Sequence, residues 1–214
     1  WQVKEIYRRV VDVAEGAAKM TGTEMTYELY AGLSDYIPNH VLSEVLHESM
    51  EEIGAPAYDE ADFALASRFF HETATLEELE AKRASLQKLF GADHLDEIEA
   101  RPLHTRISPL VWTGKVQAGS TDVGDASYVI PTAMCTTATA PLGTAAHTWQ
   151  MTAHGNTEIA HKAMLNAGEA IALAALKTME SPEILKKAHD EWLAETNGIY
   201  ECPIPKEIGP RLED

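Results

Sequence analysis

The pattern of hydrophobic and polar positions near the start of the chain changes from a helical period to a strand-like one. Across residues 3–17, apolar side chains recur at steps of three and four, which predicts an amphipathic helix that Gly22 ends. Across residues 23–30, apolar and polar side chains alternate, which predicts a half-buried strand. One helix and one strand cannot bury an adequate core. We therefore expect residues 1–34 to be the last elements of a small α/β layer.

Helical periods dominate the next part of the sequence. Asn39 is a suitable N-cap for a helix that Gly54 and Pro56 end, and helical patterns continue through residues 59–72 and 75–91. From residue 102 to 143 the composition changes, because Gly, Ser, Thr and Pro become frequent. The stretch YVIPTAMCTTATA is rich in strand-forming residues, which predicts buried strands with loops at their ends.

Two more helices are predicted near the C-terminus. The first covers residues 157–178, and Ser181 followed by Pro182 opens the second as an N-cap with proline at the first helical position. The tail from residue 201 contains too many prolines for regular structure. Together these patterns predict an α/β fold.

The composition of the chain argues against some classes of binding partner. The 214 residues include 34 acidic and 17 basic side chains, a formal net charge of −17, which disfavours nucleic acid and anionic membrane surfaces as partners. No apolar run approaches the length of a membrane span. Cys135 and Cys202 are far apart and form no CxxC motif, so we expect free thiols in a cytoplasmic protein. The chain starts at Trp1 within a helical pattern and without a signal peptide, which suggests a piece of a longer protein.

Three histidines, His147, His154 and His161, follow one another at intervals of seven residues. On one continuous helix they would share a face. Gly155 and Asn156 are poor helix formers, however, so we expect the first two histidines before the helix and the third inside it. His147 departs from an ordinary surface or core role because it lies in a glycine-containing loop after a strand-like segment. His154 is interpreted as an ordinary loop histidine.

The stretch AGSTDVGD is a second candidate, because Ser120, Thr121 and Asp122 supply hydrogen-bonding groups at consecutive positions. Two interpretations remain open: a loop that holds a substrate, or a turn whose side chains satisfy their own backbone, which the composition favours. The sequence contains no P-loop and no HExxH, GxSxG or GxGxxG motif, and its histidines and carboxylates show no metal-ligand spacing.

Four segments in order, GSTDVGD, LGTAAHTWQ, TEIAHKAML and CPIPK, resemble the C-terminal half of the M20-type metallo-amidohydrolases. Within that family the similarity is greatest to the B subunits of p-aminobenzoyl-glutamate hydrolases. The stretch IYRRVVDVAEGAAKMTGTEMTYEL, followed by YIPN, is similar to the end of the family's lid domain and the return to its catalytic domain. The resemblance implies that residues 1–34 are a remnant of an α/β lid, or dimerisation, domain. Residues 35–214 would be the C-terminal part of a catalytic domain with a mixed sheet flanked by helices.

The same resemblance implies a reaction and its cofactors. Two divalent metal ions, zinc or manganese, would activate a water that attacks the amide of p-aminobenzoyl-glutamate or a similar N-acyl amino acid, with a glutamate as general base. The implied partners are this small-molecule substrate, a second copy in a homodimer, and a paralogous A subunit. Self-association is expected through the edge of the strand at residues 23–30 or through the preceding helix.

Carried over by motif, the resemblance makes His147 the one metal ligand of this half. Ser120, Thr121, Asp122 and His161 would border the substrate. Relatives usually have Pro-Leu before the ligand histidine, where this chain has Ala145 and Ala146.

The family's other ligands and its glutamate base have no counterpart in the sequence. We therefore expect the chain alone to be inactive and metal-free. An alternative hypothesis is a non-catalytic binding or interaction domain derived from the same fold.

Overall fold

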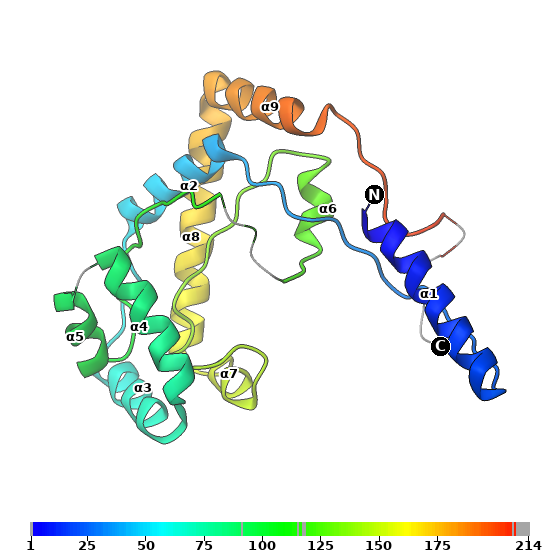
Figure 1. Cartoon of the computed structure of the whole chain (residues 1–214). Helices are drawn as coiled ribbons and strands as arrows, with labels where there is room; N and C mark the ends of the chain where they lie inside the picture. Colours follow the sequence, from blue (N-terminus) through cyan, green and yellow to red (C-terminus); the bar gives the residue numbers. More distant parts are fainter. Residues whose placement is uncertain (1, 91, 115, 117–118, 207, 209–214) are drawn as a thin grey trace. The chain divides into compact units, whose positions relative to one another are not determined.

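The computed structural model describes residues 2–90, 92–114, 116, 119–206 and 208. Within these residues all regular secondary structure is helical, and neither a strand nor a sheet forms (Figure 1). The predicted α/β fold with a mixed sheet is therefore wrong for the described part of the chain. The helices belong to two compact units, which are described in turn.

The first unit combines residues 1–34 with the C-terminal residues from 202 onward. Helix α1 spans Gln2–Thr21, where the sequence predicts a helix, and none of its residues is buried. Pro203 packs closely on the segment that follows the helix, because a Cβ added to Gly32 would lie 3.1 Å from the Cβ of Pro203. Glycine at this position allows that close approach.

The strand predicted at residues 23–30 is wrong, since this segment has no regular structure. An alternating pattern determines which side chains share a face, but a strand also requires a neighbouring strand for its backbone hydrogen bonds. The described residues offer no such neighbour. Instead Tyr27 contacts Tyr7 of α1 edge-on, with the ring centroids 6.3 Å apart.

The second unit covers residues 35–201 and contains the other helices of the described chain. In chain order these are α2 (His40–Ile53), α3 (Glu60–Thr73), α4 (Leu76–Phe90), α5 (Ala92–Ala100), α6 (Val123–Ser127), α7 (Trp149–His154), α8 (Glu158–Glu180) and α9 (Pro182–Thr196).

The predicted helix ends of this unit are confirmed at several caps. The Asn39 side chain accepts a hydrogen bond from the first turn of α2, and Gly54 ends that helix with a φ of 82°. Ser181 caps α9 in the same way, with Pro182 at its first position. The Asn39 amide also donates to the Ala188 carbonyl of α9 at 2.9 Å, so one residue both starts α2 and joins it to α9.

The longest helix, α8, packs against α2 and α9. Its Ile159 is fully buried and forms a core cluster with Ala66 of α3 and Leu103. Half of the buried apolar residues described in this unit are alanines, so the core that these helices enclose is thin.

The buried strands predicted between residues 102 and 143 are also wrong. Residues 132–143, here called the strap, form an irregular extended segment that hydrogen-bonds to neighbouring elements at single points. Asn39 donates from its backbone to the Thr132 carbonyl at 3.1 Å, and the Thr137 hydroxyl donates to the Ala163 carbonyl of α8 at 3.1 Å. The strand-forming composition is present, but no described segment lies beside the strap as a partner strand.

Candidate functional site

His147 follows a part of the strap whose path is fixed by close packing. The Leu142 N–H donates to the Pro102 carbonyl at 2.8 Å. The next residue, Gly143, has a φ of 79°, and a Cβ there would lie 2.9 Å from Leu79 Cδ2 of α4. Both the backbone conformation and the limited space therefore require glycine immediately before the loop.

His147 itself adopts a left-handed backbone conformation with a φ of 59°. Such a φ is uncommon in residues other than glycine and is frequent at functional sites. The conformation is supported by Thr148, which caps α7: its hydroxyl accepts from Met151 N at 3.4 Å and donates to the Ala145 carbonyl at 2.8 Å. The imidazole of His147 is exposed.

The described residues do not complete a metal site around His147. A catalytic zinc ion takes three protein ligands. No group of three histidine, cysteine, aspartate or glutamate side chains that could hold a metal ion occurs within the described ranges. His147 has the chemistry of one ligand, and the remaining ligands of such a site would have to come from outside these residues.

His154 differs from its interpretation as a loop histidine. It is the last residue of α7, its side chain is completely buried, and its ring lies 4.0 Å from the ring of Phe69 on α3, tilted by 49°. Neither ring nitrogen has a hydrogen-bond partner among the described residues. Burial lowers the pKa of the imidazole, so His154 is neutral at physiological pH.

His161 lies in the first turn of α8, where its Nδ1 is 3.6 Å from Glu158 Oε1. The three equally spaced histidines therefore occupy a loop, the end of α7 and the start of α8. The prediction that no single helix carries them is confirmed.

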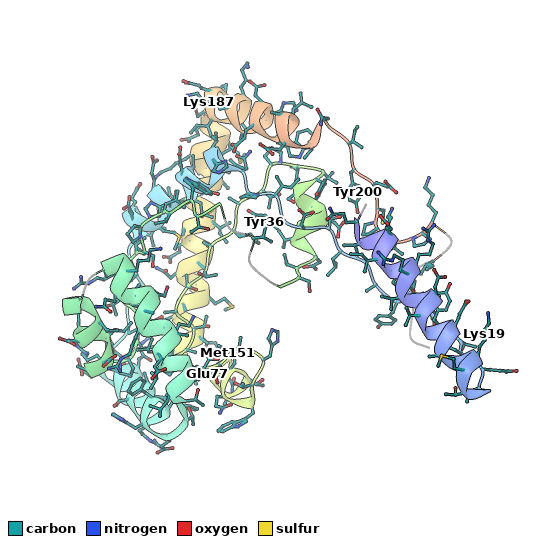
Figure 2. The ribbon with its side chains drawn as sticks, viewed as in Figure 1. Lys19, Tyr36, Glu77, Met151, Lys187 and Tyr200 are labelled. Carbon is teal, nitrogen blue, oxygen red and sulfur yellow. The ribbon has the colours of Figure 1, made fainter. Side chains whose placement is uncertain are left out.

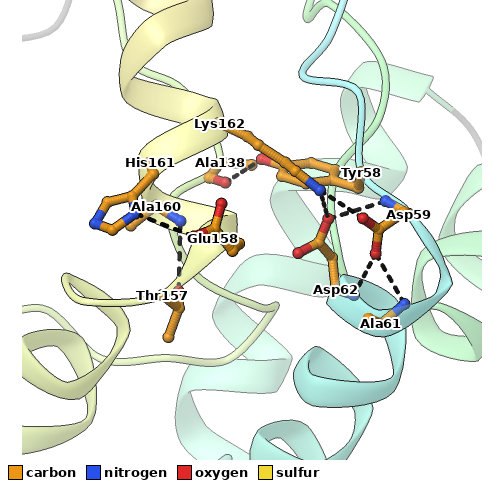
Figure 3. A network of polar contacts seen from close by, with 10 residues as sticks. All are labelled: Tyr58, Asp59, Ala61, Asp62, Ala138, Thr157, Glu158, Ala160, His161 and Lys162. Carbon is orange, nitrogen blue, oxygen red and sulfur yellow. Dashed lines mark hydrogen bonds and ion pairs between the residues drawn. The ribbon is translucent and has the colours of Figure 1, made fainter.

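A polar network adjoins His161 through its neighbour Lys162 (Figure 3). The Lys162 ammonium lies 2.8 Å from Asp59 Oδ2 and 2.5 Å from Asp62 Oδ2, so it joins α8 to the start of α3. The Asp62 side chain is only 4% exposed, and a buried carboxylate requires a partner of this kind. Hydrogen bonding to the two carboxylates raises the pKa of Lys162, and its hydrogen bond lowers the pKa of Asp59.

Tyr58 completes this network. Its hydroxyl donates a short hydrogen bond to the Ala138 carbonyl of the strap. Burial, together with the nearby negative charge of Asp62, raises the pKa of Tyr58 to about 12, although Lys162 partly opposes the shift. No sequence motif marks the residues of this network. The one signal available was the pair Asp59 and Asp62, whose spacing of three matches the capping box that the structure contains.

The Ser120–Asp122 loop is arranged as a turn. The Thr121 hydroxyl accepts from Val123 N at 3.3 Å, and the Thr121 carbonyl accepts from Gly124 N at 3.1 Å. Asp122 lies at the N-cap of α6 without a side-chain cap, and both Asp122 and Ser120 are exposed. Thr121 thus satisfies its own backbone, as the composition favoured.

A groove of about 960 Å³ runs along the strap, here called the strap groove. Side chains from α2, α4, α5, α7 and α8 line it, including Met151 of α7, and Tyr36 contributes from the segment before α2 (Figure 2). Its described lining includes neither His147 nor His161, and it does not include residues 120–122. The structure therefore does not gather the predicted site residues around this groove.

Within the part of the chain that the structure describes, every helix is too short or too polar to cross a membrane.

Comparison with known proteins identifies a relative of the chain. No protein-family model and no solved structure matches. The chain is 32% identical over 216 residues to the B subunit of p-aminobenzoyl-glutamate hydrolase from Escherichia coli (strain K12). The match covers 97% of this chain and 44% of that protein, so the chain spans less than half the length of its relative. The predicted resemblance is confirmed: the chain is similar over nearly its whole length to the B subunit of p-aminobenzoyl-glutamate hydrolase, and the match is consistent with a C-terminal part of such an enzyme.

Proposed function

We propose that the chain is part of an M20-type hydrolase that cleaves the amide bond of p-aminobenzoyl-glutamate or a similar N-acyl amino acid. The observation that carries this proposal is the 32% identity to a p-aminobenzoyl-glutamate hydrolase over 97% of the chain. The chain spans 44% of that relative, and in this proposal the complete reaction uses further polypeptide. We also propose a cytoplasmic location, in keeping with the two free cysteines, Cys135 and Cys202.

In this proposal His147 is one ligand of a centre that holds two divalent ions, zinc or manganese. Its exposed imidazole and its supported left-handed backbone suit a ligand held in one orientation. When bound, the metal ions would activate water and stabilise the developing oxyanion. In this proposal the other ligands and the general base come from outside the described residues.

We propose that residues of two segments contact the substrate. His161 lies half-exposed at the start of α8, and Ser120 and Asp122 are exposed, so all three are accessible to a ligand. Thr121 is less suited, because its hydroxyl already accepts a backbone hydrogen bond. We further propose that the complete protein is a homodimer. Because the relative is named as one of the subunits of its enzyme, a paralogous A subunit is a second partner to test.

The isolated chain provides the first test. With p-aminobenzoyl-glutamate and either manganese or zinc, the purified 214 residues should show no turnover and should not retain metal after gel filtration, since three ligands are not present together in the described ranges. Appreciable turnover by the isolated chain would contradict the proposal that the centre is completed from elsewhere.

The second test uses the longer protein encoded with this sequence. His147→Ala should lower kcat/KM for p-aminobenzoyl-glutamate by roughly a thousandfold or more and reduce the metal content. His71→Ala, which alters an exposed histidine near the end of α3, is the matched control and should leave both unchanged. Equal activity of the two variants would exclude His147 as a ligand.

A non-catalytic binding or interaction domain is the second candidate. It is favoured by the absence, within the described ranges, of any group of three metal-binding side chains. The two functions differ in what precedes Trp1 in the coding sequence. Upstream metal ligands and a pair of glutamates support the hydrolase, whereas a longer protein without them supports the binding domain.

A further inference from the structure

The strap groove differs in charge from the rest of the molecule. The chain has 34 acidic residues, yet no aspartate or glutamate occurs in the described lining of the groove. Its charged side chains are Lys82 and Arg106, and much of the remaining wall is apolar. A solvated face of so acidic a chain would be expected to carry carboxylates, so this composition is typical of a surface that a partner covers.

Apolar side chains from several elements meet in the groove. Leu46 and Met50 come from α2, Leu86 from α4 and Ile98 from α5, while Met134 projects from the strap with 47% of its surface exposed. Leu46 and Ile98 are already buried, but Leu110, Trp112 and Met134 of the same lining are 38–47% exposed, so a partner that filled the groove would bury apolar area that the unit leaves in water.

The backbone of the strap indicates what kind of partner fits. For residues 134–136, neither the N–H groups nor the carbonyl groups form a hydrogen bond to another described residue. These groups lie in sequence along one wall of the groove, half-buried or exposed. A row of unpaired donors and acceptors beside apolar pockets is suited to another polypeptide, which can supply complementary backbone groups and side chains.

The greater length of the relative points to one source for that polypeptide. More than half of the E. coli protein has no counterpart in this chain, whereas almost all of this chain has a counterpart in it. We propose that the strap groove is the docking surface for the part of the hydrolase polypeptide that this chain does not span. This inference rests on the relationship to a longer protein and not on the reaction, so a binding experiment without substrate tests it separately from the proposed function.

The experiment co-expresses the full 214-residue chain with the affinity-tagged remainder of the E. coli relative. We expect the two polypeptides to be purified together in equal amounts. Cys135 lines the groove and provides a direct reporter. In a Cys202→Ser background, in which Cys135 is the only thiol of the chain, its rate of modification by a thiol reagent should fall roughly tenfold or more in the complex.

Two variants locate the surface. Met134→Arg places a charge in the groove at a position that is 47% exposed, and it should reduce capture roughly tenfold or more. Leu185→Arg, at a position on α9 that is 48% exposed and absent from the groove lining, should leave capture unchanged.

The proposal is overturned if no complex forms, or if both variants are captured equally. Two further results with the chain alone would also overturn it. One is protection of Cys135 when the chain concentration is raised, which would indicate a second copy in the groove. The other is protection of Cys135 by added p-aminobenzoyl-glutamate. The thiol measurement uses an unsubstituted groove, so it decides the question even if Met134→Arg fails to fold.

Discussion

At the scale of single residues, His154 is the side chain whose surroundings fit its chemistry least well. An imidazole always presents polar nitrogens, yet this ring is completely buried against Phe69, and its nitrogens have no partner among the described residues. A buried polar atom left unpaired costs roughly 1–3 kcal/mol. His154→Leu should therefore leave the free energy of unfolding at about pH 7.5 unchanged or raise it, by up to about 2 kcal/mol.

His154 should also make stability depend on pH. Its pKa in the folded state lies below the ordinary value of about 6.5, so the unfolded chain binds the proton more readily. The stability associated with the neutral ring is present above about pH 6.5 and is lost as pH falls through the folded pKa. Urea titrations at about pH 7.5 and about pH 5.5 should show a decrease for the wild type that is smaller in His154→Leu. The matched variant of an exposed histidine, His71→Leu, should keep the full decrease.

Tyr58 is a residue whose hydrogen bond joins two parts of the second unit. Its hydroxyl donates to the Ala138 carbonyl of the strap, and its ring packs edge-on against Phe63 with centroids 6.2 Å apart. Tyr58→Phe keeps the ring and removes the donor, so we expect a loss of about 1 kcal/mol in the free energy of unfolding. Hydrogen exchange should also accelerate at the Thr139 amide, whose N–H donates to the Thr137 carbonyl at 3.0 Å. No change in exchange there would contradict a role for Tyr58 in holding the strap.

At the scale of elements, α2 begins at a cap supplied partly by another helix. The Glu191 carboxylate of α9 accepts from the backbone N–H groups of His40 and Val41, at 2.8 Å and 3.1 Å, and from the His40 ring at 2.5 Å. Burial alone would raise the pKa of Glu191, but the hydrogen bonds outweigh burial and lower it. A carboxylate at a helix N-terminus also interacts favourably with the helix dipole.

This cap gives a prediction with a defined pH range. Glu191→Ala should lower the free energy of unfolding by about 1–2 kcal/mol at neutral pH, the usual cost of a lost N-cap. Because the folded pKa is depressed, the contribution is present above the ordinary glutamate pKa of about 4.3 and is lost as pH falls through the folded value. Thermal unfolding at about pH 7 and at about pH 3 should show the two proteins converge at the lower pH. Glu195→Ala, an exposed position on the same helix, is the control and should resemble the wild type at both.

The helices show which structural features could be predicted from the sequence pattern. The predicted starts at Asn39 and Ser181 are confirmed because a cap is a local property: the side chain and the groups that it bonds lie within a few residues. The strands predicted at residues 23–30 and within 102–143 fail because strand pairing depends on a distant segment, which no local pattern specifies. The short α6 and α7 lie in segments whose glycines and threonines suggested loops only.

The candidate site shows the same division. The sequence singled out His147 through a motif, but its left-handed backbone depends on the bonds of Thr148 to Ala145 and Met151, which only a three-dimensional structure reveals. The Lys162 network could not be predicted, since Asp62 lies 100 positions away in the sequence. Whether a histidine such as His154 is buried likewise depends on which helix packs on it.

At the scale of the whole molecule, α1 leaves an apolar face uncovered within its own unit. This face is formed by side chains that are between 57% and 89% exposed: Val3, Ile6, Val10, Val13 and Met20. Most of them follow steps of three and four residues, the spacing that forms a continuous seam along a helix. The strand edge first considered as a site of self-association is not formed, so this helical face is the remaining candidate.

We therefore expect the purified chain to self-associate through α1. Light scattering at high concentration should give an apparent mass of about twice that of one chain, since burying such a seam removes apolar area from water in both copies. Val13→Glu should restore the mass of one chain, because a carboxylate in a desolvated seam lacks a partner. Glu15→Gln, on the same helix outside the seam, should leave the dimer intact. A wild-type chain that remained strictly monomeric at high concentration would show that α1 is instead covered by a different polypeptide or stays exposed.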